Sequence, residues 1–215
     1  MVRPVGAAAL LVELGDRIDA GINAQVIALD RTLAAAAPAG LVETVPSYAS
    51  LLMTFDPLVT DGAALAAEAL HLARTLPAPQ GQACEHIVPI CYDGPDLPAV
   101  AGRTGLTIDQ VIAAHLAGDY RCYMYGFAPG YAYLGGVPEA LQLPRKGSAE
   151  RGHPVGSIIV AGAQCLITTL PMPTGWWVIG RTSLRVLDPL GERPFRFDPG
   201  DRIRFERVDP VAPDN

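Results

Sequence analysis

The second half of this chain consists of short β-prone runs that alternate with glycine and proline. From Gly126 onward no apolar residues recur at helical spacing, and the β-prone runs cover residues 157–161, 165–169, 176–179, 185–187 and 202–207. Short strands joined by tight turns leave unpaired edges unless the sheet curls round and pairs with itself. This pattern therefore predicts a closed or nearly closed β-barrel.

The segment before this region predicts a strand, a helix and a second strand. Residues 85–91 are β-prone, and residues 119–125 form a similar run that leads into the barrel. Between them, Thr107 and Gln110 have the spacing of a capping box, in which each side chain binds the other residue's backbone amide. We expect a helix that starts there and ends near His115.

The first third of the chain shows helical periodicity instead. A strand at 7–13 is followed by a helix that begins after Asp19, whose carboxylate can accept hydrogen bonds from the first-turn amides. Apolar residues recur along one face of this helix, namely Ile22, Val26, Leu29 and Leu33. Pro38 and Gly40 end the helix.

Two further strands and a second helix complete a βαββα order. The strands are expected at 41–45 and 51–55, and the helix begins after Asp61. Its apolar residues are Leu65, Leu72 and Leu76. This order is typical of a ferredoxin-like α/β sandwich, so the sequence predicts an α+β fold with two different halves.

A run of two prolines and a glycine at 77–82 marks the boundary between those halves. We expect an N-terminal α+β domain at 1–80 and a C-terminal β-barrel domain at 81–215. The tail after Asp209 is polar and rich in proline, which is typical of a frayed end.

Charge and cysteine content narrow the class of protein. Sixteen Lys and Arg against 22 Asp and Glu give a net charge of −6, which argues against nucleic acid as a partner. The four cysteines are widely spaced, which is typical of reduced thiols in the cytoplasm. No apolar run reaches the roughly 18 residues needed to cross a bilayer, and Glu13 and Asp16 interrupt the apolar start. We therefore expect a cytoplasmic protein without a membrane partner.

Glycine and aromatic residues are densest at 126–136, which includes Phe127, Gly130, Tyr133 and Gly135. Glycines let backbone approach a ligand closely, and aromatic rings supply stacking walls, so the segment predicts the rim of a pocket. The alternative is a tight barrel corner in which the glycines only satisfy positive φ angles.

Two later segments carry cations beside glycine. Arg145 and Lys146 lie in a loop at 143–148, and a planar guanidinium suits a carboxylate or a phosphate. Trp176 and Arg181 belong to a segment at 175–182. The alternatives are a solvated loop, and a barrel strand whose arginine is paired at the surface.

Metal and nucleotide motifs are missing from the sequence. The four histidines are too scattered to predict a metal site, although any of them is a possible general base. We find no Walker loop, no Rossmann fingerprint and no Gly-x-Ser-x-Gly elbow. The sequence thus predicts no ATP site in this chain.

Nearly the whole chain resembles one family, that of the 5-oxoprolinase B subunits, also called allophanate hydrolase subunit 1, with a sporulation kinase inhibitor branch and a carboxyltransferase-type domain. The resemblance runs from 9–16, through 48–57 and 88–97, to the most specific part at 126–136. It continues through Pro144, Arg145, Gly156, Ser157 and 161–164, and closes with Gly175, Trp176, 179–182, Asp188 and Pro189.

The resemblance implies an N-terminal α+β domain joined to a cyclophilin-like β-barrel. It also implies a hydrolase assembly that opens 5-oxoproline to glutamate with ATP and water, in which this chain, inactive alone, works with subunits A and C. Related domains occur in urea-degrading carboxylases, so an allophanate or urea-type hydrolase or carboxylase subunit is an alternative. A histidine-kinase inhibitor with an apolar surface at Tyr131 and Trp177 is another, and a prolyl isomerase follows only from the barrel.

The chemistry of such an assembly suggests roles for individual residues. Transient anions need cations and backbone amides, so we expect Arg145 and Arg181 to share one anion-binding cavity with the 126–136 loop. Phe127, Gly130, Tyr133, Gly135 and Trp176 complete the expected substrate contacts, and His115 or Gln164 would position water as the catalytic residue.

The chain departs from the family pattern at several positions that bear on the substrate. Where the family commonly has further arginines, this sequence has Glu150 and Gly152, and the apolar residue that usually follows is replaced by His153. Cys165 and Thr174 stand at common threonine and glycine positions. A different lactam, amide or urea-like substrate is the alternative that these changes raise.

Overall fold

The computed structural model describes residues 1–76 and 83–209. It divides the chain into two compact units, Met1–Gln82 and Ala83–Asn215. The expected linker at 77–82 and the expected frayed tail from residue 210 lie outside the described residues.

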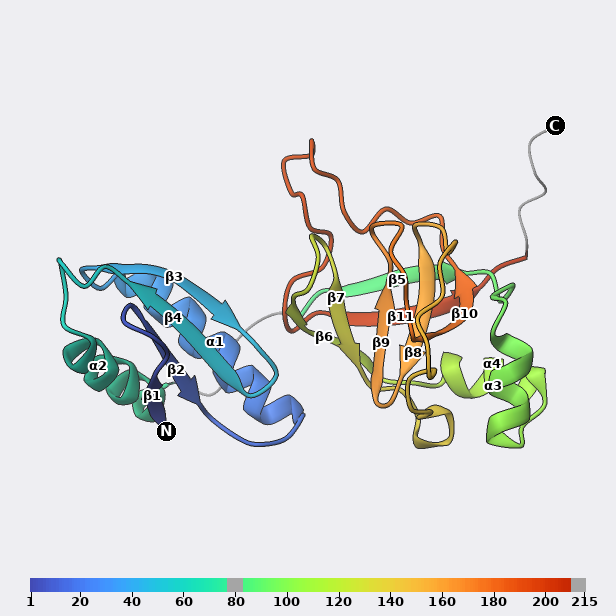
Figure 1. The fold of residues 1–215 in the computed structure, drawn as a ribbon, viewed down its shortest axis with the longest axis horizontal. Coiled ribbons are helices and arrows are strands. Elements are labelled where there is room, and N and C mark those ends of the chain that lie inside the picture. The colour runs from blue at the N-terminus through green and yellow to red at the C-terminus, as the bar shows by residue number, and fades with distance from the viewer. Residues whose placement is uncertain (77–82, 210–215) are drawn as a thin grey trace. The chain divides into compact units, whose positions relative to one another are not determined.

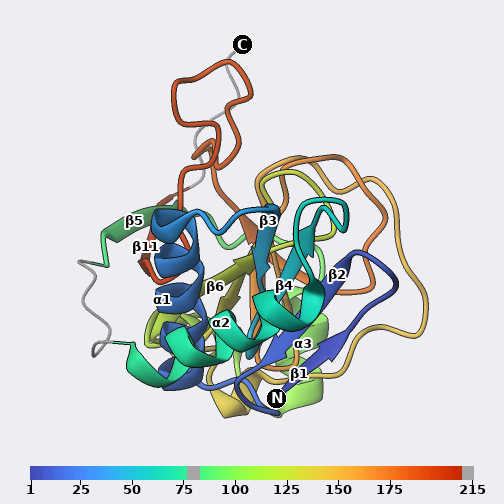
Figure 2. The same cartoon turned by 90° about the vertical axis from the view of Figure 1, so that its left-hand side faces the viewer.

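Unit 1 is a four-stranded antiparallel sheet with two helices (Figure 1). Its elements are β1 (Val2–Pro4), β2 (Ala9–Glu13), α1 (Ala20–Ala36), β3 (Leu41–Pro46), β4 (Ser50–Phe55) and α2 (Gly62–Thr75). The strand order is β1-β2-β4-β3, and buried and half-buried residues alternate along β4. Both helices cover the same face of this sheet (Figure 2).

The predicted helix stripe forms the core of unit 1. Val26, Leu29 and Leu33 are fully buried, and the side chain of Asp19 accepts hydrogen bonds from the first-turn amides at Gly21 and Ile22. The βαββα order is present, but the fourth strand of the sheet is β1, which the sequence analysis missed. A ferredoxin-like domain ends in a strand after the second helix, so that prediction is not confirmed.

Unit 2 contains a seven-stranded sheet with two short helices and one 3-10 turn. Its elements are β5 (Glu85–Ile90), α3 (Leu97–Thr104), α4 (Ile108–Leu116), β6 (Tyr120–Tyr125), β7 (Ala132–Gly135), η1 (Glu139–Leu141), β8 (Ser157–Ala161), β9 (Gln164–Ile167), β10 (Trp177–Arg181) and β11 (Arg202–Arg207). The strand order is β10-β8-β9-β7-β6-β11-β5, with β11 and β5 parallel and the other pairs antiparallel.

Backbone hydrogen bonds join the two outer strands of this sheet. Cys91, just after β5, and Arg181, at the end of β10, exchange two N–H to O bonds of 2.9 Å each. A bond of 3.3 Å from the Gly94 amide to the Ile179 carbonyl continues the contact. The sheet is therefore a nearly closed β-barrel, as the pattern of short strands predicted.

The barrel core explains why these strands are so apolar. Leu134, Ile158, Cys165 and Phe197 are fully buried in one cluster together with residues of α3 and α4. The capping box at Thr107 and Gln110 is present at the start of α4. The helix α3 was not predicted, and Pro98 in its first turn fits the preference of proline for helix starts.

The run at 185–187 is not a strand of the barrel. It forms one limb of an exposed arm, residues 185–197, whose limbs meet at an isolated bridge between Leu187 and Phe195. Among the described residues, no helix has the length and apolar character to cross a membrane.

Candidate functional site

A second apolar cluster covers the outer face of the barrel, on strands β7 to β10. Because side chains alternate across a strand, Leu134 and Cys165 point into the barrel core, whereas Tyr133 and Leu166 point outward. The outward cluster consists of Tyr131, Ile159, Ala161, Leu166, Trp176 and Val178, with Ala128, Tyr133 and Met172 packed against it. We call this the outer-face cluster.

Three residues that the sequence singled out meet on the outer-face cluster. The rings of Tyr133 and Trp176 lie edge to face with their centroids 6.1 Å apart. The guanidinium carbon of Arg145 lies 5.4 Å from the centroid of the Trp176 ring. Burial raises the pKa of Tyr133, and the charge of Arg145 opposes that rise. The exposed guanidinium of Arg145 therefore lies above the buried ring of Trp176 and near the half-buried ring of Tyr133. This arrangement suits a flat molecule that carries a carboxylate.

Backbone pairing fixes the loop that carries Arg145. The Lys146 amide donates to the Gly175 carbonyl at 2.7 Å, and Glu150 and Thr174 exchange two backbone bonds of 2.9 Å. The Lys146 ammonium donates to Asp96 at 2.9 Å and to Glu150 at 2.8 Å. Asp96 in turn accepts from the Val178 amide in β10. The backbone next to Arg145 is therefore fixed by these bonds.

Gln164 and Gly135 face the same side of the sheet as Tyr133. They lie opposite each other across β9 and β7, and Gln164 is also opposite Ala161 of β8. A Cβ at Gly135 would lie 2.5 Å from the ring of Tyr123, so glycine is needed there for packing. The structure thus brings Gln164 to the outer-face cluster. Gly135 is needed there to make room for the ring of Tyr123.

Phe127 sits in a strained turn at the edge of the cluster. Its φ angle is +68°, and the Ala128 amide donates to the Gly126 carbonyl at 2.8 Å around it. A turn of this kind with positive φ is rare for any residue that has a Cβ. The Phe127 side chain is 76% exposed, and its ring centroid lies 5.8 Å from that of Tyr131. A strained backbone that presents an exposed aromatic ring, as at Phe127, favours a functional contact for that ring.

The rest of this loop is shaped by packing. Gly130 has a φ angle of +73°, and a Cβ there would lie 2.8 Å from that of Leu187. The Gly126 and Tyr131 amides donate to the Tyr131 and Ala128 carbonyls. These amides and that of Ala128 are occupied within the loop, so they do not supply the anion donors that we expected from it.

Arg181 lies away from the outer-face cluster. It is five residues beyond Trp176 on an extended strand, which spans about 16 Å. Its Nε atom lies 2.6 Å from Asp93 Oδ2, and it lines a cavity of about 320 Å³ with Cys91, Pro154 and Thr182. Arg145 does not line that cavity. The expected cavity shared by the two arginines is therefore not formed, because they lie at opposite ends of β10.

His115 is part of the barrel core. It is fully buried, its Nδ1 atom lies 2.7 Å from the Tyr92 hydroxyl, and its ring packs against Tyr120 and Phe205. Burial lowers the pKa of His115 to about 3. Cys165 lies 3.9 Å from the other ring nitrogen, and burial raises the pKa of its thiol. This environment favours a structural histidine over one that activates solvent water.

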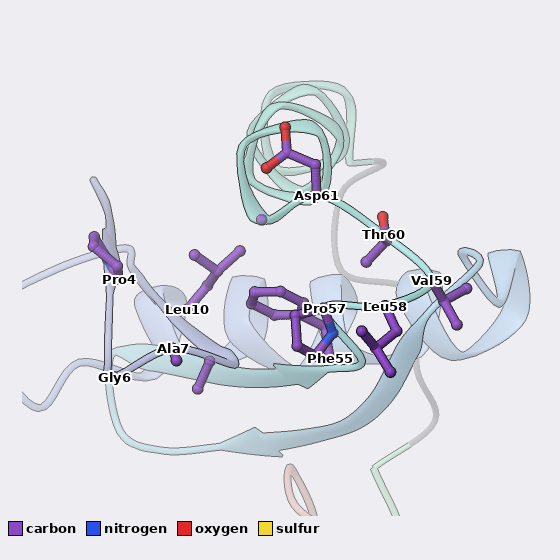
Figure 3. Close-up of a pocket in the computed structure, with 12 residues that line it drawn as sticks. Pro4, Gly6, Ala7, Leu10, Phe55, Pro57, Leu58, Val59, Thr60 and Asp61 are labelled. Atoms are coloured by element: carbon purple, nitrogen blue, oxygen red, sulfur yellow. The ribbon is translucent and has the colours of Figure 1, made fainter.

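A cavity in unit 1 contains none of the predicted site residues. Its volume is about 560 Å³, and Figure 3 shows Leu10, Phe55 and Leu58 around it with Asp61 at the start of α2. The Asp61 carboxylate accepts a hydrogen bond of 3.1 Å from the Ala63 amide, so it serves as a helix cap. Among its lining residues only Thr60 and Asp61 have polar side chains, so it offers little for catalysis.

Sequence reasoning missed Asp96, which links α3, the Arg145 loop and β10. It also set aside His86, which pairs with Asp201 at 2.8 Å. Position in the sequence carries no signal for either pairing, because the partners come from distant segments. Across 1–76 and 83–209, no three His, Cys, Asp or Glu side chains gather in a way that would hold a metal ion.

Comparison with known proteins finds relatives that are B subunits of 5-oxoprolinases. Its sequence is 29% identical to the 5-oxoprolinase B subunit of Bacillus subtilis (strain 168), over 96% of this chain and 92% of the relative. It is 40% identical to the 5-oxoprolinase B subunit of Escherichia coli O157:H7, over 55% of this chain and 56% of the relative.

A solved structure shows the same fold. The crystal structure of TTHA0988 matches with a TM-score of 0.85 and 37% identity, over 100% of this chain and 41% of the longer one. This chain therefore spans about two fifths of TTHA0988. The family profile described as carboxyltransferase domain, subdomain C and D, matches residues 1–197. The chain therefore belongs to the family of carboxyltransferase domains, subdomain C and D.

Proposed function

We propose that this chain is the B subunit of an ATP-dependent 5-oxoprolinase, which opens 5-oxoproline to glutamate together with subunits A and C. The observation that carries the proposal is the Arg145 guanidinium held above Trp176 on an apolar face. The related B subunits of 5-oxoprolinases support it, one of them over nearly the full length.

The outer-face cluster matches the chemistry of 5-oxoproline, a flat five-membered lactam with one carboxylate. The guanidinium of Arg145 can bind that carboxylate through two parallel hydrogen bonds. The half-buried ring of Tyr133, next to the buried ring of Trp176, offers an apolar wall for the flat lactam. Gln164 lies on the same face and carries an amide that can both donate to and accept from the lactam group.

ATP makes the resonance-stabilised lactam reactive. When the γ-phosphoryl group of ATP is transferred to the lactam carbonyl oxygen, water can add to the carbonyl carbon. Cleavage of the C–N bond then leaves an acyl phosphate. A second water converts this to glutamate and phosphate. Because the sequence has no nucleotide-binding motif, we assign the ATP chemistry to another subunit and substrate positioning to this one.

Three of the departures from the family pattern, Cys165, Glu150 and Thr174, have a clear place in the structure. Cys165 points into the barrel core, so it leaves the outer-face cluster unchanged. Glu150 and Thr174 pair with each other and, through Lys146, stabilise the loop of Arg145. Glu150 and Thr174 therefore support the loop that carries Arg145.

The kinase-inhibitor alternative relied on exposed rings at Tyr131 and Trp177. Both residues are only 5% exposed, so they do not form such a surface. The exposed aromatic side chain beside the cluster is Phe127. We assign it to contact with a partner subunit that completes the site, which also explains why the isolated chain should be inactive.

Reconstitution tests the proposed function. The chain is mixed with subunits A and C from the same genome, and glutamate formation from 5-oxoproline is measured with and without ATP. We expect turnover only when all three subunits and ATP are present. Allophanate serves as a second substrate, and turnover of allophanate but not of 5-oxoproline would contradict the proposal.

A further inference from the structure

A separate cavity of about 340 Å³ lies between the exposed arm at 185–197 and β5. Cations predominate among the charged residues that line it. They are Arg185, Arg193 and Arg196, against the carboxylate of Asp188. His86 and the ring of Phe195 also line the cavity. None of them belongs to the outer-face cluster.

Backbone hydrogen bonds join the two limbs of the arm, and a buried ring anchors its base. The Arg196 amide donates to the Val186 carbonyl at 3.0 Å, and the Asp188 amide donates to the Pro194 carbonyl at 2.9 Å. Phe197 is fully buried at the base of the arm. Arg185 and Arg196 are therefore presented from neighbouring limbs on a supported backbone.

Within the part of the chain that the structure describes, two of these guanidinium groups have no carboxylate partner. Arg193 is neutralised by Asp198, with 2.6 Å between their atoms. Across the described ranges 1–76 and 83–209, neither Arg185 nor Arg196 forms an ion pair. Asp188 is the acidic residue in the lining, and its Oδ1 atom accepts from the Leu190 amide at 3.4 Å. Uncompensated guanidinium groups around a cavity favour an anionic ligand.

His86 lines the same cavity with a ring of fixed orientation. Its Nε2 atom lies 2.8 Å from Asp201 Oδ2, and Asp201 is 5% exposed. Asp201 also accepts hydrogen bonds from the amides of Cys84, at 3.0 Å, and Asp198, at 2.8 Å. Because the carboxylate only accepts, Nε2 carries the proton and the ring is held in one orientation.

We infer that this cavity binds a phosphate group through Arg185 and Arg196, with His86 as a further contact. Guanidinium forks match the oxygen geometry of phosphate, and the cavity has room for inorganic phosphate or a small phosphate monoester. The inference rests on this cavity alone. A chain without 5-oxoprolinase activity would still bind phosphate there.

Calorimetric titration of the full chain with inorganic phosphate at fixed salt tests this inference. We expect saturable binding, and Kd should rise at least about tenfold in the R185Q/R196Q double variant, because two charged donors are lost. H86Q should weaken binding less. The control is R204Q, which removes an exposed arginine that already pairs with Glu206.

The outcomes separate specific recognition from a general charge effect. The Tm of the double variant should equal that of the wild type, because neither arginine is engaged in an ion pair. Absence of saturable phosphate binding, or equal weakening in R204Q, would overturn the inference. Succinate is titrated as well, and binding as tight as that of phosphate would show that the cavity recognises carboxylates instead.

Discussion

Cys91 and Arg181 exchange both of their backbone hydrogen bonds, each 2.9 Å long, and so connect the two outer strands of the barrel. The bridge leaves no room for a side chain at the neighbouring Gly180, where a Cβ would lie 2.4 Å from the Cys91 carbonyl oxygen. Closure of the barrel thus depends on a glycine next to one of the arginines that the sequence singled out.

The first prediction concerns that glycine. Gly180→Ala should lower the free energy of unfolding of unit 2 by about 2 kcal/mol or more, because backbone must shift to admit the methyl group. Denaturant unfolding followed by tryptophan fluorescence measures it, since both tryptophans of the chain, Trp176 and Trp177, lie in unit 2.

Gly102→Ala is the matched control. Gly102 lies within α3, and a Cβ there would meet no atom within 4 Å. Alanine should stabilise the helix by up to about 1 kcal/mol. Equal destabilisation by both substitutions would show that the bridge is not what makes Gly180 necessary.

The second prediction concerns the support of the Arg145 loop. Lys146 and Asp96 are 8% and 13% exposed at their side chains. Lys146→Met should cost about 3 kcal/mol, because it leaves a mostly buried carboxylate without its cation. Arg193→Met breaks an exposed pair with Asp198 and should cost less than about 1 kcal/mol. A small and equal cost for both variants would contradict a buried, stabilising Lys146.

Stability at high pH provides a further check on Lys146. Burial acts to lower the pKa of Lys146, but its hydrogen bonds to Glu150 and Asp96 outweigh this and the pKa is raised above 10.5. The folded state therefore holds this proton more tightly than the unfolded state. Its stabilising contribution should be complete below pH 10.5 and should disappear as the pH rises further. Lys146→Met should lack that alkaline loss.

The third prediction uses the buried imidazole of His115. Its pKa is about 3 in the folded chain and 6.5 in the unfolded chain, so only the unfolded state takes up the proton between these values. Stability should fall by about 1.4 kcal/mol per pH unit as the pH drops below 6.5. His115→Gln should remove that part of the slope, whereas the exposed His71→Gln should not. Parallel slopes for wild type and His115→Gln would disprove a neutral buried histidine.

The fourth prediction distinguishes two arginines that lie over neighbouring tryptophans. Arg145 lies over Trp176, and Arg103 lies 5.0 Å from the ring centroid of Trp177. In the reconstituted assembly, Arg145→Ala should lower kcat/KM for 5-oxoproline about 10- to 100-fold, mainly through KM, because we propose that Arg145 binds the substrate carboxylate and not the reacting carbonyl. Arg103→Ala should leave kcat/KM unchanged. An equal loss of kcat/KM in the two variants would contradict a place for Arg145 in the substrate site.

The fifth prediction tests the strained turn. Phe127→Gly should raise the free energy of unfolding by about 1 kcal/mol, because glycine tolerates the positive φ angle. The same substitution should weaken binding to the partner subunit in analytical ultracentrifugation. Leu190→Ala, at a residue that is 98% exposed on the arm, is the control and should leave binding unchanged. A stable variant that still assembles normally would rule out a contact role for Phe127.

Local patterns in the sequence predicted the elements whose cause is local. The stripe through Val26, Leu29 and Leu33 and the cap at Asp19 define α1, because apolar spacing and first-turn amides act within a few residues. The capping box of Thr107 and Gln110 predicted the start of α4 for the same reason. The runs of short strands predicted a barrel, since unpaired edges are costly wherever they lie.

Only the tertiary structure decided which of the predicted residues share a surface. Arg145 and Arg181 both lie in glycine-containing segments, yet strand pairing places them at opposite ends of β10. His115 has an imidazole side chain of the kind that serves as a general base, but packing buries it in the barrel core. Pairing between segments far apart in the chain sets the register of each strand, and register determines which side chains face the core or solvent. No local pattern carries that information.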